Sequence, residues 1–152
     1  MSKNKRDYII EVFVNECFHV LAGLCASLLL YVLYRDIKVS LLCFVVSILV
    51  DVDHLYDFFV AYGFSFDYKK FWTFDFFGKN QKIILPLHGW EYCVVLFALS
   101  LLFNNIIILG VASGLAAHYF VDTFTNFVVP GTYFILYRYK IGFNIHRLGT
   151  LK

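Results

Sequence analysis

Long hydrophobic runs alternate with short polar breaks along the chain, and four of these runs reach the length of a membrane-spanning helix. The runs cover residues 8–34, 39–62, 84–103 and 105–129. A helix needs about 20 apolar residues to cross roughly 30 Å of hydrocarbon. The pattern therefore predicts an all-α integral membrane protein, a four-helix bundle that forms a single domain over residues 1–152.

The polar breaks indicate how the helices are connected. The stretch from Arg35 to Lys38 and the pair Asn104-Asn105 are short enough to be tight turns. We therefore expect helices 1 and 2, and helices 3 and 4, to form antiparallel hairpins. Pro86 fits the first turn of the third helix, where its missing N–H costs nothing.

The stretch between the second and third helices, residues 63–82, has a different composition. It mixes many aromatic side chains with aspartate and lysine, so it is too polar to span a bilayer and too aromatic for a water-exposed loop. We predict that it lies in the membrane interface as an aromatic segment with snorkelling lysines. The tail, residues 130–152, has a similar composition and is predicted to be cytoplasmic.

Composition and charge agree with a membrane protein. Hydrophobic residues make up 61% of the chain and charged residues 16%, against about 45–50% and about 25% in soluble domains. A net charge of +2 without a long basic run does not favour a nucleic-acid partner. The predicted partner is therefore membrane lipid, and the pattern leaves the oligomeric state open.

The distribution of basic residues predicts the orientation. Eleven lysines and arginines lie in the N-terminus, in residues 63–82 and in the tail, against two, Arg35 and Lys38, in the first turn. By the positive-inside rule, this asymmetry predicts a multi-pass protein of the cell (inner, or cytoplasmic) membrane with both termini in the cytoplasm.

Ionisable side chains inside the hydrophobic runs are the most unusual feature of the sequence. The motif VDVDHLYD, residues 50–57, places several of them within the second helix. An aspartate at the centre of a spanning helix costs about 2.5–3.5 kcal/mol on insertion scales. A cluster of such residues is therefore expected to hold something positive, and a bound cation is the simplest candidate.

The depth of these residues in the membrane and their spacing along each helix predict one shared site. All four helices bring them to the cytoplasmic half, and pairs such as His118 and Asp122 are spaced to share one helix face. Pairs of histidine and carboxylate that face into a helical bundle build metal sites. Asp57, near the end of its helix, is assigned to the membrane interface. The candidate metal ligands are His19, Asp51, Asp53, His54, His88, Glu91, His118 and Asp122.

These ligands suit two or three divalent metal ions. With nitrogen and oxygen donors and no suitably placed cysteine, we predict zinc, with manganese or iron as alternatives. Such ions polarise a phosphoryl oxygen and activate a bound water. Asp51 and Glu91 are the candidate catalytic carboxylates, and Glu16, Asn126 and Arg138 are candidates to support the ligands or to hold substrate.

Several motifs also carry a resemblance to a known family. In chain order they are His19, DxDH at 51–54, His88 within LPLHGWE, HxxxD at 118–122 and YFILYR at 133–138. This series resembles the membrane-bound, metal-dependent hydrolases typified by the LexA-regulated YdjM proteins, over nearly the whole chain. That family is itself distantly similar to zinc-dependent phospholipase C and the P1-type nucleases. The resemblance implies a helical hydrolase with clustered metals. Because the site is expected at head-group depth, the function that the resemblance implies is hydrolysis of a phospholipid or another membrane phosphoester.

The chain departs from that family's pattern at two places. The family usually has proline before the first aspartate, where this chain has Val50, so one unbroken helix is expected over 39–62. The family's second histidine after the helix-3 histidine is absent, and Glu91 is its candidate replacement.

Two other classes of function use the same residues. A haem or electron-transfer protein would take axial ligands from His19, His54, His88 and His118, and a metal-ion carrier would hold the ion in transit. Carboxylates beside the histidines disfavour haem. A polar site confined to one half of the membrane disfavours transport.

Overall fold

The computed structural model describes residues 5–126 and 129–148, which are helical with no β-strand. An isolated bridge joins Lys82 to Asn144. Lys3 and Lys152, which entered the count of basic residues, lie outside the described residues. The helices are α1 (Lys5–Tyr34), α2 (Ile37–Leu49), α3 (His54–Tyr62), α4 (Tyr68–Phe71), α5 (Asp75–Asn80), α6 (Trp90–Leu102), α7 (Ile106–Thr125) and α8 (Ile135–Lys140), with 3-10 turns η1 (Val50–Asp53), η2 (Pro130–Tyr133) and η3 (Ile145–Arg147).

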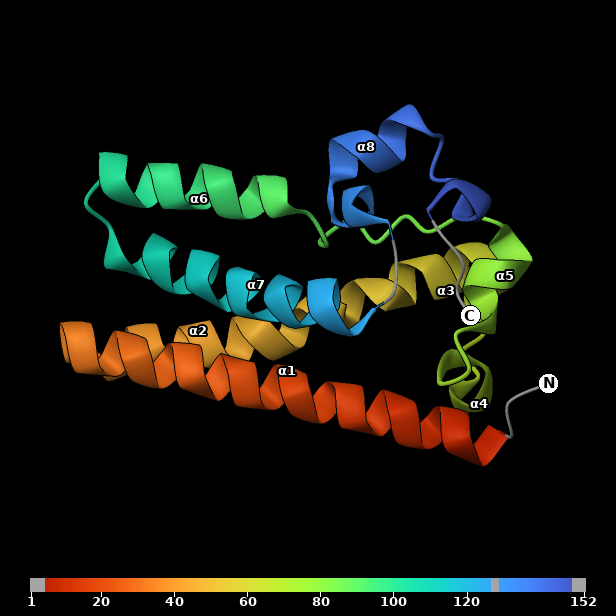
Figure 1. Ribbon diagram of the computed structural model, residues 1–152, viewed down its shortest axis with the longest axis horizontal. Helices are drawn as coiled ribbons and strands as arrows, with labels where there is room; N and C mark the ends of the chain where they lie inside the picture. Colours follow the sequence, from red (N-terminus) through yellow and green to blue (C-terminus); the bar gives the residue numbers. More distant parts are fainter. Residues whose placement is uncertain (1–4, 127–128, 149–152) are drawn as a thin grey trace.

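The long helices form two antiparallel hairpins, α1 with α2 and α6 with α7 (Figure 1). Each hairpin turn combines a residue of positive φ, Arg35 at 55° or Asn104 at 47°, with a capping side chain. Asp36 accepts hydrogen bonds from the first amides of α2, and Asn105 does the same for α7. Helices α1, α2 and α7 pack against one another, whereas α6 packs on α7. The two hairpins predicted from the polar turns are thus present.

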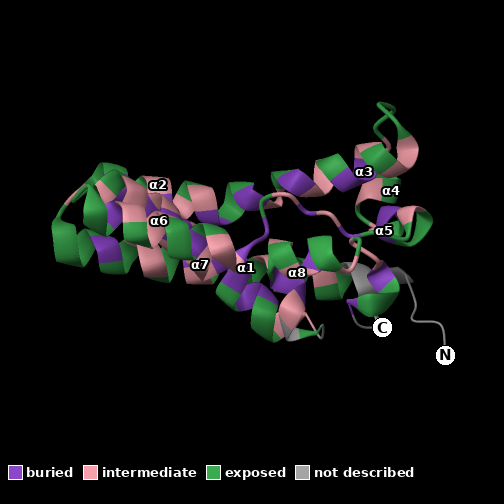
Figure 2. Ribbon diagram, turned by 90° about the horizontal axis from the view of Figure 1, so that it is seen from above, coloured by how far each residue is buried: buried purple, intermediate pink, exposed green. Residues whose placement is uncertain are grey.

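Three helical stretches are long and apolar enough to cross a membrane. They are Ile10–Tyr34, Ile37–Tyr62 and Ile106–Thr125, with mean hydropathies of 2.0, 1.8 and 1.5. Helix α6 is also apolar but has only 13 residues. Figure 2 shows exposed residues along all the long helices, and many of them are large hydrophobics. The length and composition of these helices indicate a membrane protein.

The expected helix over 39–62 is interrupted at η1, so the expectation of an unbroken helix is wrong. A 3-10 turn tightens the backbone to i→i+3 hydrogen bonds and redirects the side chains that follow. Here the turn lies between α2 and α3 without any proline. It allows Asp51, Asp53 and Asp57 to reach one and the same segment of the chain, residues 84–89.

The third helix begins at Trp90 rather than at residue 84, because the preceding backbone is held by side chains. Asp57 accepts hydrogen bonds from the amides of Ile84 and Leu85 at 3.0 and 2.7 Å. Asp53 accepts one from the amide of Leu87 at 2.8 Å. These amides are satisfied outside a helix, so Pro86 lies in this irregular segment and not in a first helical turn.

The fourth helix ends at Thr125, whereas the sequence predicted residue 129. Asn126 adopts an extended conformation with φ −93° and ψ 114°, and its amide donates the closing bond to the carbonyl of Asp122. Residues 127 and 128, which the prediction included, lie outside the described residues.

The aromatic segment 63–82 and the tail pack together at one end of the hairpins. One buried hydrophobic cluster joins the two parts, and its members are Phe58, Phe76, Phe77, Ile83, Leu85, Ile145 and Leu148. Other aromatic side chains of this segment stay exposed, notably Phe64 and Trp72. The segment therefore contributes both a hydrophobic core and an exposed aromatic surface.

Gly114 lets α7 approach α2 closely. A Cβ at this position would lie 2.5 Å from the carbonyl oxygen of Cys43 and 3.0 Å from Cβ of Val46. Gly114→Ala is therefore expected to destabilise the protein by about 1–3 kcal/mol, the usual cost of overpacking. Thermal unfolding in detergent micelles measures this loss.

Gly78→Ala in α5 is the matched control, because an added Cβ there meets nothing within 4 Å. This control is expected to be neutral or stabilising through better helix propensity. If Gly114→Ala unfolds at the same temperature as Gly78→Ala, the close approach of α2 and α7 is refuted.

Candidate metal centre

Four side-chain atoms from three parts of the chain meet between η1, α7 and the segment 84–89. They are Nε2 of His88, Nε2 of His118, Oδ1 of Asp51 and Oδ2 of Asp122. The two nitrogens lie 3.2 Å apart. Asp51 Oδ1 lies 3.3 Å from each nitrogen, and Asp122 Oδ2 lies 3.5 Å from His88 Nε2 and 3.4 Å from His118 Nε2. Both nitrogens therefore lie within 3.5 Å of an oxygen of each carboxylate.

The other ring nitrogen of each histidine is anchored to an oxygen that can only accept. Nδ1 of His88 lies 2.9 Å from Asp53 Oδ2, and Nδ1 of His118 lies 2.8 Å from the carbonyl oxygen of Ser47. Each Nδ1 therefore carries the proton, and each Nε2 directs a lone pair into the centre. Two lone pairs that face each other at this distance need a proton or a cation between them.

His88 shows how strongly the carboxylates favour positive charge here. Burial disfavours the imidazolium form, but hydrogen bonds to Asp51 and Asp53 outweigh it and raise the pKa of His88 to about 9. A proton or a metal ion can supply that charge. The donor set therefore fits a cation.

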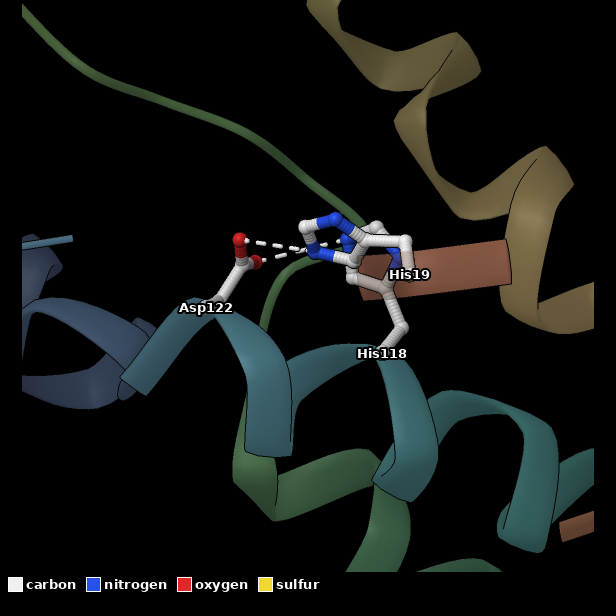
Figure 3. A group of neighbouring side chains, drawn as sticks. All are labelled: His19, His118 and Asp122. Carbon is white, nitrogen blue, oxygen red and sulfur yellow. Dashed lines mark hydrogen bonds and ion pairs between the residues drawn. The ribbon is translucent and has the colours of Figure 1, made fainter. Parts of the chain in front are cut away.

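His19 extends the centre towards α1. Its Nε2 lies 3.2 Å from Oδ1 of Asp122, and its ring centroid lies 4.2 Å from that of His118. Figure 3 shows the two rings side by side with the Asp122 carboxylate facing them. Nδ1 of His19 donates to the carbonyl of Asn15. Asp122 thus presents one oxygen to His19 and the other to His88 and His118.

Two groups of side chains among the described residues could hold a metal ion. They are His19 with His118 and Asp122, and Asp51 with His54 and His88. Each group contains predicted ligands from at least two helical segments or loops. The structure therefore brings six of the eight predicted ligands into these groups, through contacts between residues far apart in sequence.

Asp53 lies close to the centre and contacts the ring nitrogen of His88 that points away from it. Its Oδ2 accepts from the Leu87 amide and from Nδ1 of His88. Its buried Oδ1 lies 3.3 Å from Nδ1 of His54. Asp53 therefore orients His88, as carboxylates commonly orient metal-bound histidines. Asn126 has a similar role, because its Nδ2 donates to Asp122 Oδ1 and to the hydroxyl of Tyr133.

The side chain of Glu91 lies at the start of α8 and not among the four donors of the centre. Its carboxylate accepts hydrogen bonds from the amides of Ile135 and Leu136 at 3.1 and 2.9 Å, which caps the start of α8. His88 lies before α6 begins, so it does not share a helix face with Glu91 as the spacing suggested. Neither metal-binding group in the described part of the chain includes Glu91.

Arg138 holds backbone rather than facing an open site. The side chain is fully buried, and its Nη2 donates to the carbonyls of Leu85, at 3.0 Å, and His88. Burial lowers the pKa of this guanidinium, while the carboxylates of Asp53 and Glu91 oppose the shift. Sequence reasoning placed Arg138 on a phosphate oxygen, but its recorded partners stabilise the loop that carries His88.

Asp57 is a structural residue that the sequence prediction assigned to the membrane interface. It is 1% exposed and holds two amides of the segment that leads to His88. Its spacing of four residues from Asp53 was the available signal, since both side chains lie on one face and reach the same loop.

A small cleft leads to the centre from the side of α1 and α4. It has a volume of about 120 Å³. The partly exposed Asp51 lines it together with His54, and Glu16 lines it from α1. Phe71, Trp72 and Phe74 form the aromatic wall. The cleft is therefore a route by which a small polar group reaches Asp51.

Comparisons with known proteins do not place the chain in a family. Searches against protein-family models, curated proteins and solved structures found no significant match. The functional argument therefore depends on the geometry of this centre.

Asp57→Asn tests whether the buried carboxylate holds the loop. An asparagine has one acceptor oxygen, so it leaves one of the two amides without its partner, at a cost of about 1–3 kcal/mol. The exposed Asp67 also accepts two backbone amides, at the start of α4. Asp67→Asn is expected to be neutral because asparagine caps as well as aspartate. Equal unfolding temperatures of the two variants would contradict the role assigned to Asp57.

Proposed function

We propose that the chain is a membrane-embedded, metal-dependent hydrolase that acts on a phosphoester of a membrane lipid. The observation that carries the proposal is the set of four donors on His88, His118, Asp51 and Asp122. Two donors that shared one tetrahedral zinc ion at about 2.0–2.1 Å would lie about 3.3–3.4 Å apart, and the five separations given above run from 3.2 to 3.5 Å. This agreement favours zinc over larger cations. The donor atoms themselves also suit manganese or iron.

Asp122 and His19 support a second ion beside the first. A carboxylate that presents one oxygen to each of two groups is a natural bridge between two ions. His19, His118 and Asp122 also form one of the two groups of side chains that could hold a metal ion. We therefore propose two ions, the second near His19, in agreement with the two or three expected from the sequence.

Divalent ions at this position would supply Lewis acidity and a bound water of lowered pKa. The chain's own residues would do the rest. Asp53, Ser47 and Asn126 orient the ligands. Glu16, in the cleft beside Asp51, takes the catalytic role that was expected of Asp51 and Glu91 from the sequence, because Asp51 belongs to the donor set and Glu91 is engaged at α8. Arg138 keeps the His88 loop in place.

A lipid substrate follows from the position of the centre. The ligands lie within or beside stretches that are long and apolar enough to span a membrane. We propose that α6 is a shorter fourth span and that both termini face the cytoplasm of a cell membrane, as the basic residues suggest. The exposed aromatic surface around Phe64 and Trp72 then lies at head-group level. The motif series that resembles the YdjM-like hydrolases supports the same reaction class.

The two alternatives fit the structure less well. A haem does not fit between the facing imidazoles of His88 and His118, which lie 3.2 Å apart, and carboxylates lie beside His19 and His54 as well. A metal-ion carrier needs a polar path to the other side of the membrane. Beyond the centre, the described helices instead pack through the buried side chains of Leu30, Val39 and Cys43.

Metal content is the first test of this proposal. Detergent-purified wild type is expected to contain zinc, whereas His118→Ala and Asp122→Asn lose nearly all of it. Asp53→Asn, which weakens the support of His88 without removing one of the four donors, is expected to lower metal affinity by about 10–100-fold. His146→Ala is the control, because His146 is exposed in the tail. Elemental analysis and competition with a chromogenic chelator provide the readouts, and equal metal in wild type and His118→Ala would refute the centre.

Hydrolysis is the second test. Zinc-loaded protein in mixed micelles is expected to cleave a phosphoester of added phospholipid, to stop on chelation and to resume when zinc is restored. Glu16→Gln is expected to lower kcat by about 10²–10⁴-fold, the usual contribution of a general base. Glu11→Gln on the same helix is the matched control and is expected to retain activity. Hydrolysis that survives complete metal removal would overturn the proposal.

A further inference from the structure

An apolar groove of about 500 Å³ runs between α2 and α6. Leu49 and Val52 line one wall, Tyr92 and Leu96 line the other, and Leu115 of α7 lies between them. The cleft at Glu16 is lined instead by residues from the side of α1 and α4. The groove is therefore a separate feature from the route to the centre.

The groove offers no free polar group to a ligand. Its lining residues are valine and leucine apart from Tyr92. The Tyr92 hydroxyl is already engaged, because it donates to the carbonyl of Pro86 at 2.8 Å. A ligand held here is consequently hydrocarbon.

The position of the groove agrees with such a ligand. Residues of α2 and α7, both parts of stretches long and apolar enough to span a membrane, line it. In the hydrocarbon core of a bilayer no water is available to fill a hollow. Its volume lies within the range of about 300–1,000 Å³ typical of small-ligand sites.

The side chains of the walls favour a flexible chain over a partner helix. Membrane helices approach one another through small residues. This chain uses such residues internally, where Gly110 faces Val39 and Gly114 faces Cys43 and Val46. The groove has no glycine, alanine or serine among its lining residues. A helix of a second copy would therefore be held away from the floor, whereas an acyl chain can lie along it.

Some lining residues of the groove are sequence neighbours of residues of the centre. Val50, Val52 and Leu87 line the groove, and each directly precedes a residue of the centre or its support, Asp51, Asp53 or His88. We propose that the groove holds one acyl chain of a bilayer phospholipid, on the reverse side of the segments that carry the metal-binding residues. This inference does not depend on hydrolysis, since it requires only that the lipid bind.

Lipid retention tests the proposal. Native mass spectrometry of the detergent-purified chain is expected to find one phospholipid per chain. Leu96→Trp fills the groove and is expected to lower lipid occupancy by about tenfold, equivalent to about 1.4 kcal/mol of binding free energy. Leu101→Trp makes the same change on α6 at an exposed position outside the groove, so it is expected to retain the lipid. Equal occupancy in both variants would overturn the proposal.

A second measurement uses the unmodified chain, so it does not depend on how the variants fold. Wild type in nanodiscs with a phospholipid that carries a photoreactive diazirine on one acyl chain is illuminated and digested. Adducts are expected to concentrate on peptides that contain Leu49, Tyr92 and Leu96. Adducts spread evenly over the lipid-facing helices, or a lipid-free dimer whose contact Leu96→Trp abolishes, would refute the acyl-chain site. Loss of metal or of hydrolysis does not affect either readout.

Discussion

Side chains, rather than helical hydrogen bonds, hold the polar backbone of residues 84–89, and the candidate centre depends on this arrangement. Asp53 and Asp57 accept its amides. Arg138, Tyr92 and Tyr119 donate to its carbonyls. In hydrocarbon, an unpaired backbone group costs several kcal/mol, so irregular backbone is tolerated only where protein surrounds it. This loop positions His88 opposite His118, which a regular helix starting at residue 84 would not do.

The centre also links helices that would otherwise meet only through apolar contacts. Asp51 comes from the second apolar stretch, and Asp122 and His118 come from α7. Each carboxylate alone is costly in a membrane. The carboxylates and the imidazoles that face them offset this cost when they share positive charge. The second apolar stretch and α7 are therefore joined by these polar contacts as well as by the close approach at Gly114. Folding of the helices and binding of a cation at this candidate centre would therefore be coupled.

The long helices and most of the cluster could be predicted from sequence because they follow local rules. Run length identifies the helices, and the spacing of His118 and Asp122 identifies a shared face. The break at η1 has no such signal, because it occurs at Val50 without proline and depends on hydrogen bonds to a loop more than thirty residues away. Glu91 and Arg138 likewise have partners that no local signal in the sequence indicates. Their residue types suggested chemistry, but tertiary contacts with α8 and with the His88 loop engage them instead.

The apolar packing around Leu30, Val39 and Cys43 has a consequence for an energised membrane. A cluster of imidazoles and carboxylates is a ready relay for protons, and each charge that crosses a potential of 100 mV dissipates about 2.3 kcal/mol. Val39 and Cys43 are completely buried on the side of the hairpin turns, with Ala26, Ile106 and Leu109 packed around them. In the membrane-spanning arrangement proposed above, this layer would act as an electrical insulator between the charged centre and the far side of the bilayer.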